Sequence, residues 1–184
     1  MQLVQTVAPT QEPLTLSEVK EFVRVLDDDS DTILTSLIVS VREHVENVTN
    51  RQLCVATYEL FSNRFISRLQ KNPIKSIDKI EYMDESGDYQ TLSASSYYLY
   101  EENGVGYIEY DSDFIPFLVE HKKAVKITFT SGYDTIPESI KQYMKVKIST
   151  LFENREQYVV GVSISDFGGN FIENIIGQYK VRAV

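Results

Sequence analysis

The sequence predicts an α+β protein, a small helical bundle with an antiparallel β insertion between its second and third main helices. Two observations predict this class. Apolar residues recur at helical spacing before residue 50 and after residue 133. Between about residues 53 and 133, strand-forming residues alternate and are separated by turn signals. Because the helices bracket the β region in the sequence, an insertion into a bundle is the most economical arrangement.

The first helix is predicted at about residues 16–23. Thr15 and Glu18 have the spacing of a capping box, in which the threonine hydroxyl and the glutamate carboxylate satisfy backbone N–H groups at the helix start. Leu14 and Val19 occupy the two positions of a hydrophobic staple. Local sequence therefore specifies where this helix begins.

Two longer helices are predicted at about residues 31–49 and 137–154. Asn50 is expected to cap the end of the former, and Pro137 suits the first position of the latter. Each helix has one apolar stripe that would face a core. The earlier stripe comprises Ile33, Leu34, Leu37, Ile38, Val41, Val45 and Val48. The later stripe comprises Ile140, Met144, Ile148, Leu151 and Phe152.

The β insertion is predicted at about residues 53–133. Val125, Ile127 and Phe129 alternate with polar residues, so one face of their strand is expected to be buried. The dipeptide Asn103–Gly104 is typical of a tight hairpin turn. A second turn is expected at residues 85–88, and further strands at about residues 55–61, 77–83, 97–100 and 105–110.

The chain is expected to contain three segments. Residues 1–13 are predicted to be a flexible lead-in, residues 14–156 one domain, and residues 157–184 a C-terminal tail. The tail is too apolar for a free linker, so we expect it to dock either on its own domain or on a neighbour.

Composition and charge exclude several classes. The chain has 184 residues, of which 18 are Lys or Arg and 27 are Asp or Glu, for a formal charge of −9. This balance argues against a protein that grips nucleic acid over a broad surface, because phosphate binding needs clustered basic residues. No apolar run approaches a membrane span, and the start lacks the pattern of a secretory signal. The single cysteine, Cys54, is expected to be a buried small hydrophobe.

No catalytic, cofactor-binding or metal-binding residue is predicted. Asp27, Asp29 and Asp31 have the spacing of a calcium loop, but Thr32 and Ile38 stand where that loop needs glycine and glutamate. The two histidines have no partner at ligand spacing, and neither a nucleophile elbow nor a phosphate-binding loop is present.

Tyrosines are abundant in the β region: Tyr58, Tyr82, Tyr97, Tyr98, Tyr100, Tyr107 and Tyr110. They could form a stacking platform for nucleic-acid bases. The basic residues that such a platform needs are dispersed, since Lys122–Lys123 is the only adjacent pair after Lys20. Ordinary packing of strand residues is therefore the favoured interpretation.

Several segments, in this order and spacing, resemble the head–tail connector (adaptor) family of long-tailed bacteriophages and prophages. They are Leu14–Lys20, Leu34–Ile38, Arg42–Glu43, Thr49–Leu53, Pro73–Ile77, Val125–Tyr133, Ile136–Gln142 and Phe152–Glu156. The family's recurring Asn-Arg-Glu at the end of the last long helix is present as Asn154–Glu156. Where the family often has glycine after the helix-closing threonine, this chain has Asn50.

The resemblance implies a structural protein of the virion, assembled in the host cytoplasm, and not an enzyme. Such connectors form a ring, usually twelve-fold, that lies beneath the portal protein, receives the next neck or tail protein and surrounds the DNA exit channel. Residues 14–156 would then be the connector domain and residues 157–184 a docking arm for the portal or a neighbouring copy. DNA would pass without specific binding, and no cofactor or membrane is implied. The contacts expected in the arm are Tyr158, Val160, Val162, Phe171, Ile175, Ile176 and Tyr179.

Three alternatives remain open from the residues alone. One is another neck or tail-completion component that also assembles as a ring. Another is a small enzyme with a dispersed acidic site, which shifted carboxylate pKa values in a pocket would favour. The third is a single-stranded nucleic-acid binder, whose affinity would fall steeply with salt.

Overall fold

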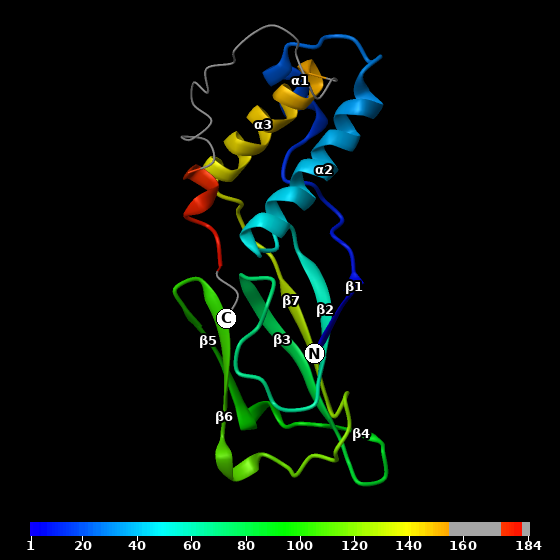
Figure 1. The fold of residues 1–184 in the computed structure, drawn as a ribbon, viewed down its shortest axis with the longest axis vertical. Helices are drawn as coiled ribbons and strands as arrows, with labels where there is room; N and C mark the ends of the chain where they lie inside the picture. Colours follow the sequence, from blue (N-terminus) through cyan, green and yellow to red (C-terminus); the bar gives the residue numbers. More distant parts are fainter. Residues whose placement is uncertain (155–173, 182–184) are drawn as a thin grey trace, which may run out of the picture. The chain divides into compact units, whose positions relative to one another are not determined.

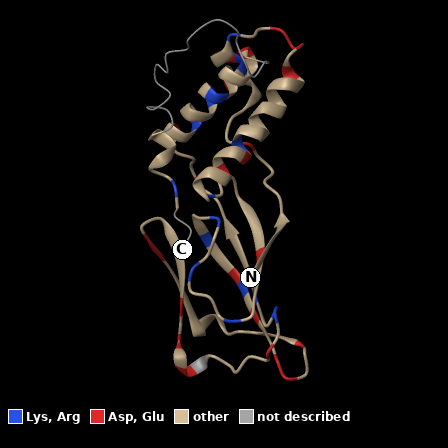
Figure 2. Ribbon diagram, in the orientation of Figure 1, with Lys and Arg blue, Asp and Glu red and all other residues tan. Residues whose placement is uncertain are grey.

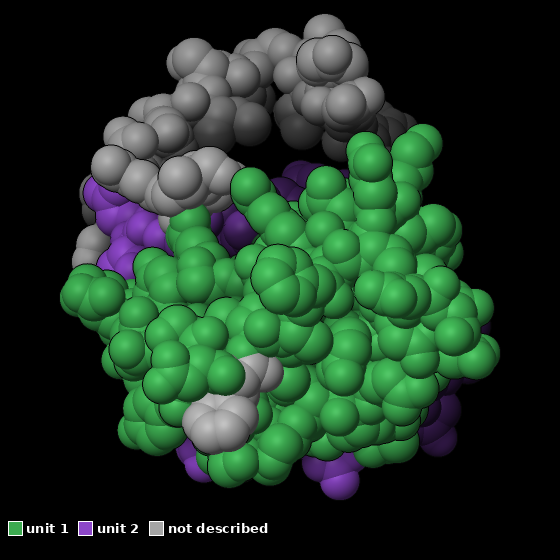
Figure 3. Space-filling view, turned by 90° about the horizontal axis from the view of Figure 1, so that it is seen from below, with its two compact units in different colours: residues 1–10, 54–134 green, residues 11–53, 135–184 purple. Residues whose placement is uncertain are grey.

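The computed structural model describes residues 1–154 and 174–181 and divides into two compact units, which Figure 3 colours separately. Unit 1 comprises residues 1–10 and 54–134, and unit 2 comprises residues 11–53 and 135–184. Both units contain residues of the domain predicted at 14–156. The α+β class is confirmed, because unit 2 is helical and unit 1 is built of antiparallel strands.

Unit 2 is built from α1 (Leu16–Val23), α2 (Asp31–Thr49) and α3 (Glu138–Glu153), which pack against one another (Figure 1). The three predicted helices are therefore present. Its buried apolar side chains that are at most 3% exposed are Leu14, Val19, Leu34, Ile38, Val41, Val45, Leu53, Ile140, Tyr143, Met144, Ile148 and Ile176. Two members of the predicted stripes, Ile33 and Leu151, are instead exposed near the helix ends.

The predicted helix ends are largely confirmed. The Thr15 hydroxyl accepts the Glu18 N–H at 3.2 Å, and the Glu18 carboxylate accepts the Thr15 N–H at 2.7 Å, which completes the capping box. Asn50 adopts the left-handed conformation (φ 56°) and ends α2. Pro137 is the N-cap of α3 and not its first residue, since the helix begins at Glu138.

Unit 1 contains a five-stranded antiparallel sheet with the order β1-β2-β7-β3-β4. The strands are β1 (Gln2–Val7), β2 (Ala56–Ser62), β3 (Ile74–Met83), β4 (Tyr89–Thr91) and β7 (Val125–Ser131). Val125, Ile127 and Phe129 of β7 are fully buried, and Lys126, between two of them, is less so. The predicted alternation of this strand is confirmed.

A separate two-stranded sheet, β5 (Tyr97–Glu102) and β6 (Val105–Tyr110), closes around the predicted Asn103–Gly104 turn. One face of this hairpin packs against the core of the larger sheet through Ile108, Leu99 and Tyr110. Short 3₁₀ turns, η1 (Ala94–Ser96) and η2 (Ser112–Phe114), flank the two strands.

The N-terminal residues correct one expectation. Residues 1–13 were expected to be a flexible lead-in, but Gln2–Val7 form β1 and pair with β2, with Leu3 opposite Leu60. Leu3 packs against the core of unit 1, and the pairing satisfies backbone groups along one side of β2. Because β1 precedes α1, the sheet is not composed only of an insertion between α2 and α3.

Candidate interaction surfaces

Two carboxylates of the acidic stretch at the start of α2 are paired with a lysine. The Lys20 ammonium lies 2.7 Å from a carboxylate oxygen of Asp28 and 2.7 Å from one of Asp31. Hydrogen bonds to these carboxylates raise the pKa of Lys20. Within the described part of the chain, no group of three or more His, Cys, Asp or Glu side chains is arranged to hold a metal.

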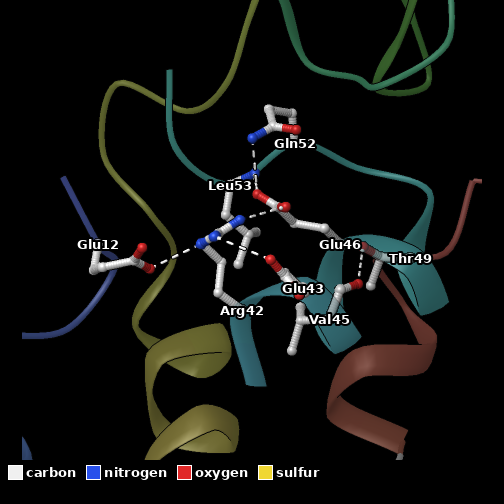
Figure 4. A network of polar contacts seen from close by, with 8 residues as sticks. All are labelled: Glu12, Arg42, Glu43, Val45, Glu46, Thr49, Gln52 and Leu53. Atoms are coloured by element: carbon white, nitrogen blue, oxygen red, sulfur yellow. Dashed lines mark hydrogen bonds and ion pairs between the residues drawn. The ribbon is translucent and has the colours of Figure 1, made fainter. Parts of the chain in front are cut away.

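Glu46 is a buried carboxylate near the end of α2, and both of its oxygens accept hydrogen bonds (Figure 4). One oxygen accepts from Arg42 Nη1 at 2.9 Å. The other accepts from Gln52 Nε2 at 2.9 Å and from the Leu53 N–H at 3.0 Å. These hydrogen bonds hold Gln52 and Leu53, which follow α2, against the end of the helix, so Glu46 has a structural role.

Arg42 extends this network to the N-terminal side of unit 2. Its Nε donates to Glu12 at 2.8 Å, and Nη2 lies 3.7 Å from Glu43. Burial alone would lower the pKa of Arg42. The attraction to Glu46 and the hydrogen bond to Glu12 outweigh this effect, so the pKa is raised. This network was not predicted from the sequence, although the i, i+4 spacing of Arg42 and Glu46 is typical of an ion pair on a helix.

The described part of the predicted docking arm belongs to unit 2. Ile176 is 1% exposed, so its side chain lies in a core and not on a free surface. The Tyr179 carbonyl accepts from Arg51 Nε at 2.7 Å, and the Val181 N–H donates to the Thr49 carbonyl at 2.9 Å. Ile175 is half-buried. Four other predicted contacts lie outside the described residues: Tyr158, Val160, Val162 and Phe171.

The outer face of the β5–β6 hairpin presents three stacked tyrosines. The ring centroids of Tyr98 and Tyr100 are 6.5 Å apart with 8° between the planes, and those of Tyr100 and Tyr107 are 5.5 Å apart with 19°. Tyr98 is 66% exposed and Tyr100 is 38% exposed. The expectation that the tyrosines are ordinary strand packing therefore fits Tyr97 and Tyr110, which contact the core, but not this row.

The loop between β2 and β3 lies along the other side of β6. Its Leu69 N–H donates to the Gly106 carbonyl at 3.0 Å, and its Ser67 carbonyl accepts from the Ile108 N–H at 2.6 Å. The Tyr110 hydroxyl donates to the Ile66 carbonyl at 2.9 Å, and burial raises the pKa of that hydroxyl. Residues 66–69 of the loop are thus held beside β6.

Charge in unit 1 is segregated along the sequence, and three of the acidic residues lie on the β5–β6 hairpin: Glu101, Glu102 and Glu109. Residues 80–121 contain ten Asp and Glu and no Lys or Arg, so the rest of the chain carries 17 acidic and 18 basic residues. Residues 60–77 contain four basic residues and no acidic one: Arg64, Arg68, Lys71 and Lys75. Figure 2 shows acidic residues on the β5–β6 hairpin and basic residues on the β2–β3 loop. The overall charge of −9 conceals this separation.

Two other features are exposed but less informative. The outer edge of β1 has no strand beside it among the described residues, and Val7 on this strand is 53% exposed. Phe117, between β6 and β7, is fully exposed. Single apolar side chains are common on protein surfaces and do not by themselves define a contact. None of the described helices has the length and hydropathy needed to span a membrane.

A family model described as "Head completion protein" matches residues 12–180 of the chain. No curated protein matches it. Among solved structures, the chain is similar to a protein in the neck of an empty gene transfer agent particle computed with C6 symmetry (TM-score 0.80, 19% identity). It is also similar to one in the virion of the native particle (0.80, 18%) and one in the native neck computed with C12 symmetry (0.69, 19%). Each similarity covers 100% of this chain and 98% of the other, and it shows a shared fold.

Proposed function

Because this chain belongs to the head completion protein family, we propose that it forms a ring with copies of itself beneath the portal and joins the head to the neck or tail. The family match confirms the predicted structural role at the head–tail junction of a phage-type virion. The ring, the portal contact and the DNA channel through its centre are our proposal.

The single observation that carries the ring is the fold shared, over the whole chain, with proteins of gene transfer agent necks computed with C6 and C12 symmetry. A closed ring also needs two different faces on each subunit that fit one another. Unit 1 offers two such faces of opposite charge, the β5–β6 hairpin and the β2–β3 loop.

We propose that this role is performed by contact alone, without catalysis. The buried carboxylates Glu46 and Glu81 support this proposal, because each is engaged by donors within the protein. A catalytic acid or base would need access to a substrate proton.

Removal of the gene from its phage or prophage tests the proposed function. We expect heads that fill with DNA but do not join tails, and joining should return when purified full-length chain is added. Protein mass spectrometry of purified virions should detect the chain, and averaged images of the neck should show it as a ring. Normal tail joining without the chain, or its absence from virions, would contradict the proposal.

We also propose that residues 157–184 form a docking arm for the portal or a neighbouring copy. Deleting residues 157–184 would remove Ile176 from the core of unit 2, so loss of joining would not separate docking from folding. The substitution Val160→Asp, combined with Val162→Asp, leaves residues 174–181 unchanged. We expect loss of head binding, and circular dichroism melting of the full-length variant checks that the fold is retained. The control is Ser163→Asp combined with Ser165→Asp, which adds the same two charges at polar residues and should leave binding intact.

A further inference from the structure

The exposed tyrosine row lies between carboxylates that have no basic partner. Tyr98, Tyr100 and Glu102 share one face of β5 because alternate residues of a strand point the same way, and Glu109 stands opposite Tyr98 on β6. Among the described residues, no Lys or Arg forms an ion pair with Glu101, Glu102 or Glu109. The outer edge of β5 therefore combines flat aromatic area with unneutralised negative charge, since Glu102 lies on the tyrosine side of this edge and Glu101 on its other side.

The β2–β3 loop has the complementary chemistry. Arg64 is exposed and Lys71 is partly exposed, and neither forms an ion pair with a carboxylate of the described residues. Guanidinium groups stack on tyrosine rings and pair with carboxylates, and β5 exposes both kinds of group.

Strand β5 and the β2–β3 loop lie on opposite sides of β6. β5 is hydrogen-bonded along one edge of β6, and loop residues Ser67 and Leu69 are hydrogen-bonded along the other. A strand has only two hydrogen-bonding edges, so β5 and the loop face away from each other across β6. Two copies placed in the same orientation, side by side, would bring β5 of one against the loop of the next.

The charges also match along the length of the contact. Ile66 lies beside Tyr110, so Arg64 is near the end of the hairpin where Tyr98 and Glu109 stand. Leu69 lies beside Gly106, so Lys71 is near the other end, where Glu101 and Glu102 stand.

We propose that the outer edge of β5, with its exposed tyrosines and carboxylates, binds the β2–β3 loop of a second copy of this chain, head to tail around a ring. Arg64 of one copy then meets Tyr98 and Glu109 of the next, while Lys71 meets Glu101 and Glu102. The proposal rests on the ring proposed above and specifies its subunit interface. It is heterologous, as ring closure requires. Nucleic acid is not the occupant, because phosphates would be repelled by these carboxylates.

Site-specific crosslinking in assembled particles tests the contact. Cys54 is buried, so introduced cysteines would dominate the reaction with a bismaleimide crosslinker. Particles are assembled from an equal mixture of Glu109→Cys chains and Arg64→Cys chains, one of them carrying an affinity tag. We expect a crosslinked dimer that contains both chains, and no dimer from either variant alone. The mismatched pair, Glu102→Cys with Arg64→Cys, should give at least tenfold less product.

Charge exchange provides the second measurement. The double substitution Glu101→Lys with Glu102→Lys should abolish incorporation into particles, and so should Lys71→Glu. The chain that carries all three changes should regain incorporation, because the two ends of the contact are again opposite in sign. Circular dichroism melting of each full-length variant checks that these surface changes leave the fold intact.

The outcomes separate this proposal from the function it rests on. If the chain is present in particles but the matched pair gives no mixed dimer, or the triple variant stays excluded, the interface is wrong and the ring remains. Dimers from Arg64→Cys chains alone would indicate a symmetric contact and would also overturn the proposal. If the wild-type chain is absent from virions, the proposed function itself fails.

Discussion

Glu46 shows how much a single buried residue can contribute to the fold. Its carboxylate has little access to water, and three donors from Arg42, Gln52 and Leu53 replace the lost hydration. The segment Thr49–Leu53, which carries part of the family resemblance, acquires a physical meaning from this arrangement. Asn50 turns the chain, and Gln52 and Leu53 then return it to the helix.

We predict that Glu46→Ala lowers the free energy of unfolding by about 3–5 kcal/mol, because removing one partner leaves the other buried polar groups unpaired. Urea unfolding followed by circular dichroism measures this change. Glu43→Ala is the matched control, since Glu43 is exposed and lies 3.7 Å from the same arginine. The control should change stability by less than about 0.5 kcal/mol. If the two substitutions lowered the free energy of unfolding equally, the hydrogen bonds of Glu46 would not be what stabilises the end of α2.

At the scale of elements, the sequence predicted those whose signals are local. The capping box predicted α1, the apolar stripe predicted α2, and Asn103–Gly104 predicted the hairpin. β1 was missed because most of its residues are exposed, so it has no regular alternation, and its partner β2 is some fifty residues away. The tyrosine row was missed for a related reason. Because Tyr97 and Tyr98 are adjacent and of the same residue type, the sequence does not show which of them faces the core, and only the folded hairpin does.

Pairing between β3 and β7 places Glu81 opposite Lys126, and this register predicts a pH dependence. Burial alone would raise the pKa of Glu81, but hydrogen bonds from Lys126 and Lys79, at 2.6 Å each, outweigh burial and lower it. A carboxylate with a lowered pKa stabilises the fold above its unfolded value of 4.5, and this contribution is lost as the pH falls through the folded value.

We therefore expect Glu81→Gln to cost about 2 kcal/mol at pH 7 and progressively less in acid. Urea unfolding of the wild-type and variant chains between pH 7 and about pH 3 gives the difference curve. Glu85→Gln, on the exposed turn before β4, serves as the control and should show no such difference. A gap between wild type and Glu81→Gln that stays constant in acid would mean that the ion pairs do not stabilise the sheet.

For the whole molecule, the distribution of charge is more informative than its total. Residues 80–121 carry ten acidic residues and no basic one, while the remaining residues are nearly neutral. The net charge could be obtained by counting. The placement of an acidic strand and a basic loop on opposite sides of β6 could not be obtained by counting, because it depends on the loop lying along β6.

This distribution leads to a prediction about DNA, which the proposed ring would surround. The four basic residues of residues 60–77 are too few to release many counterions, and the neighbouring carboxylates repel phosphates. The full-length chain should therefore give no saturable binding to duplex or single-stranded DNA in fluorescence anisotropy, even at low salt. A variant with Glu101, Glu102 and Glu109 changed to lysine should gain weak binding that falls with added salt, which shows that the assay detects such contacts. Salt-sensitive binding by the wild-type chain would instead favour a nucleic-acid binder, and the tyrosine row would then be the first surface to test.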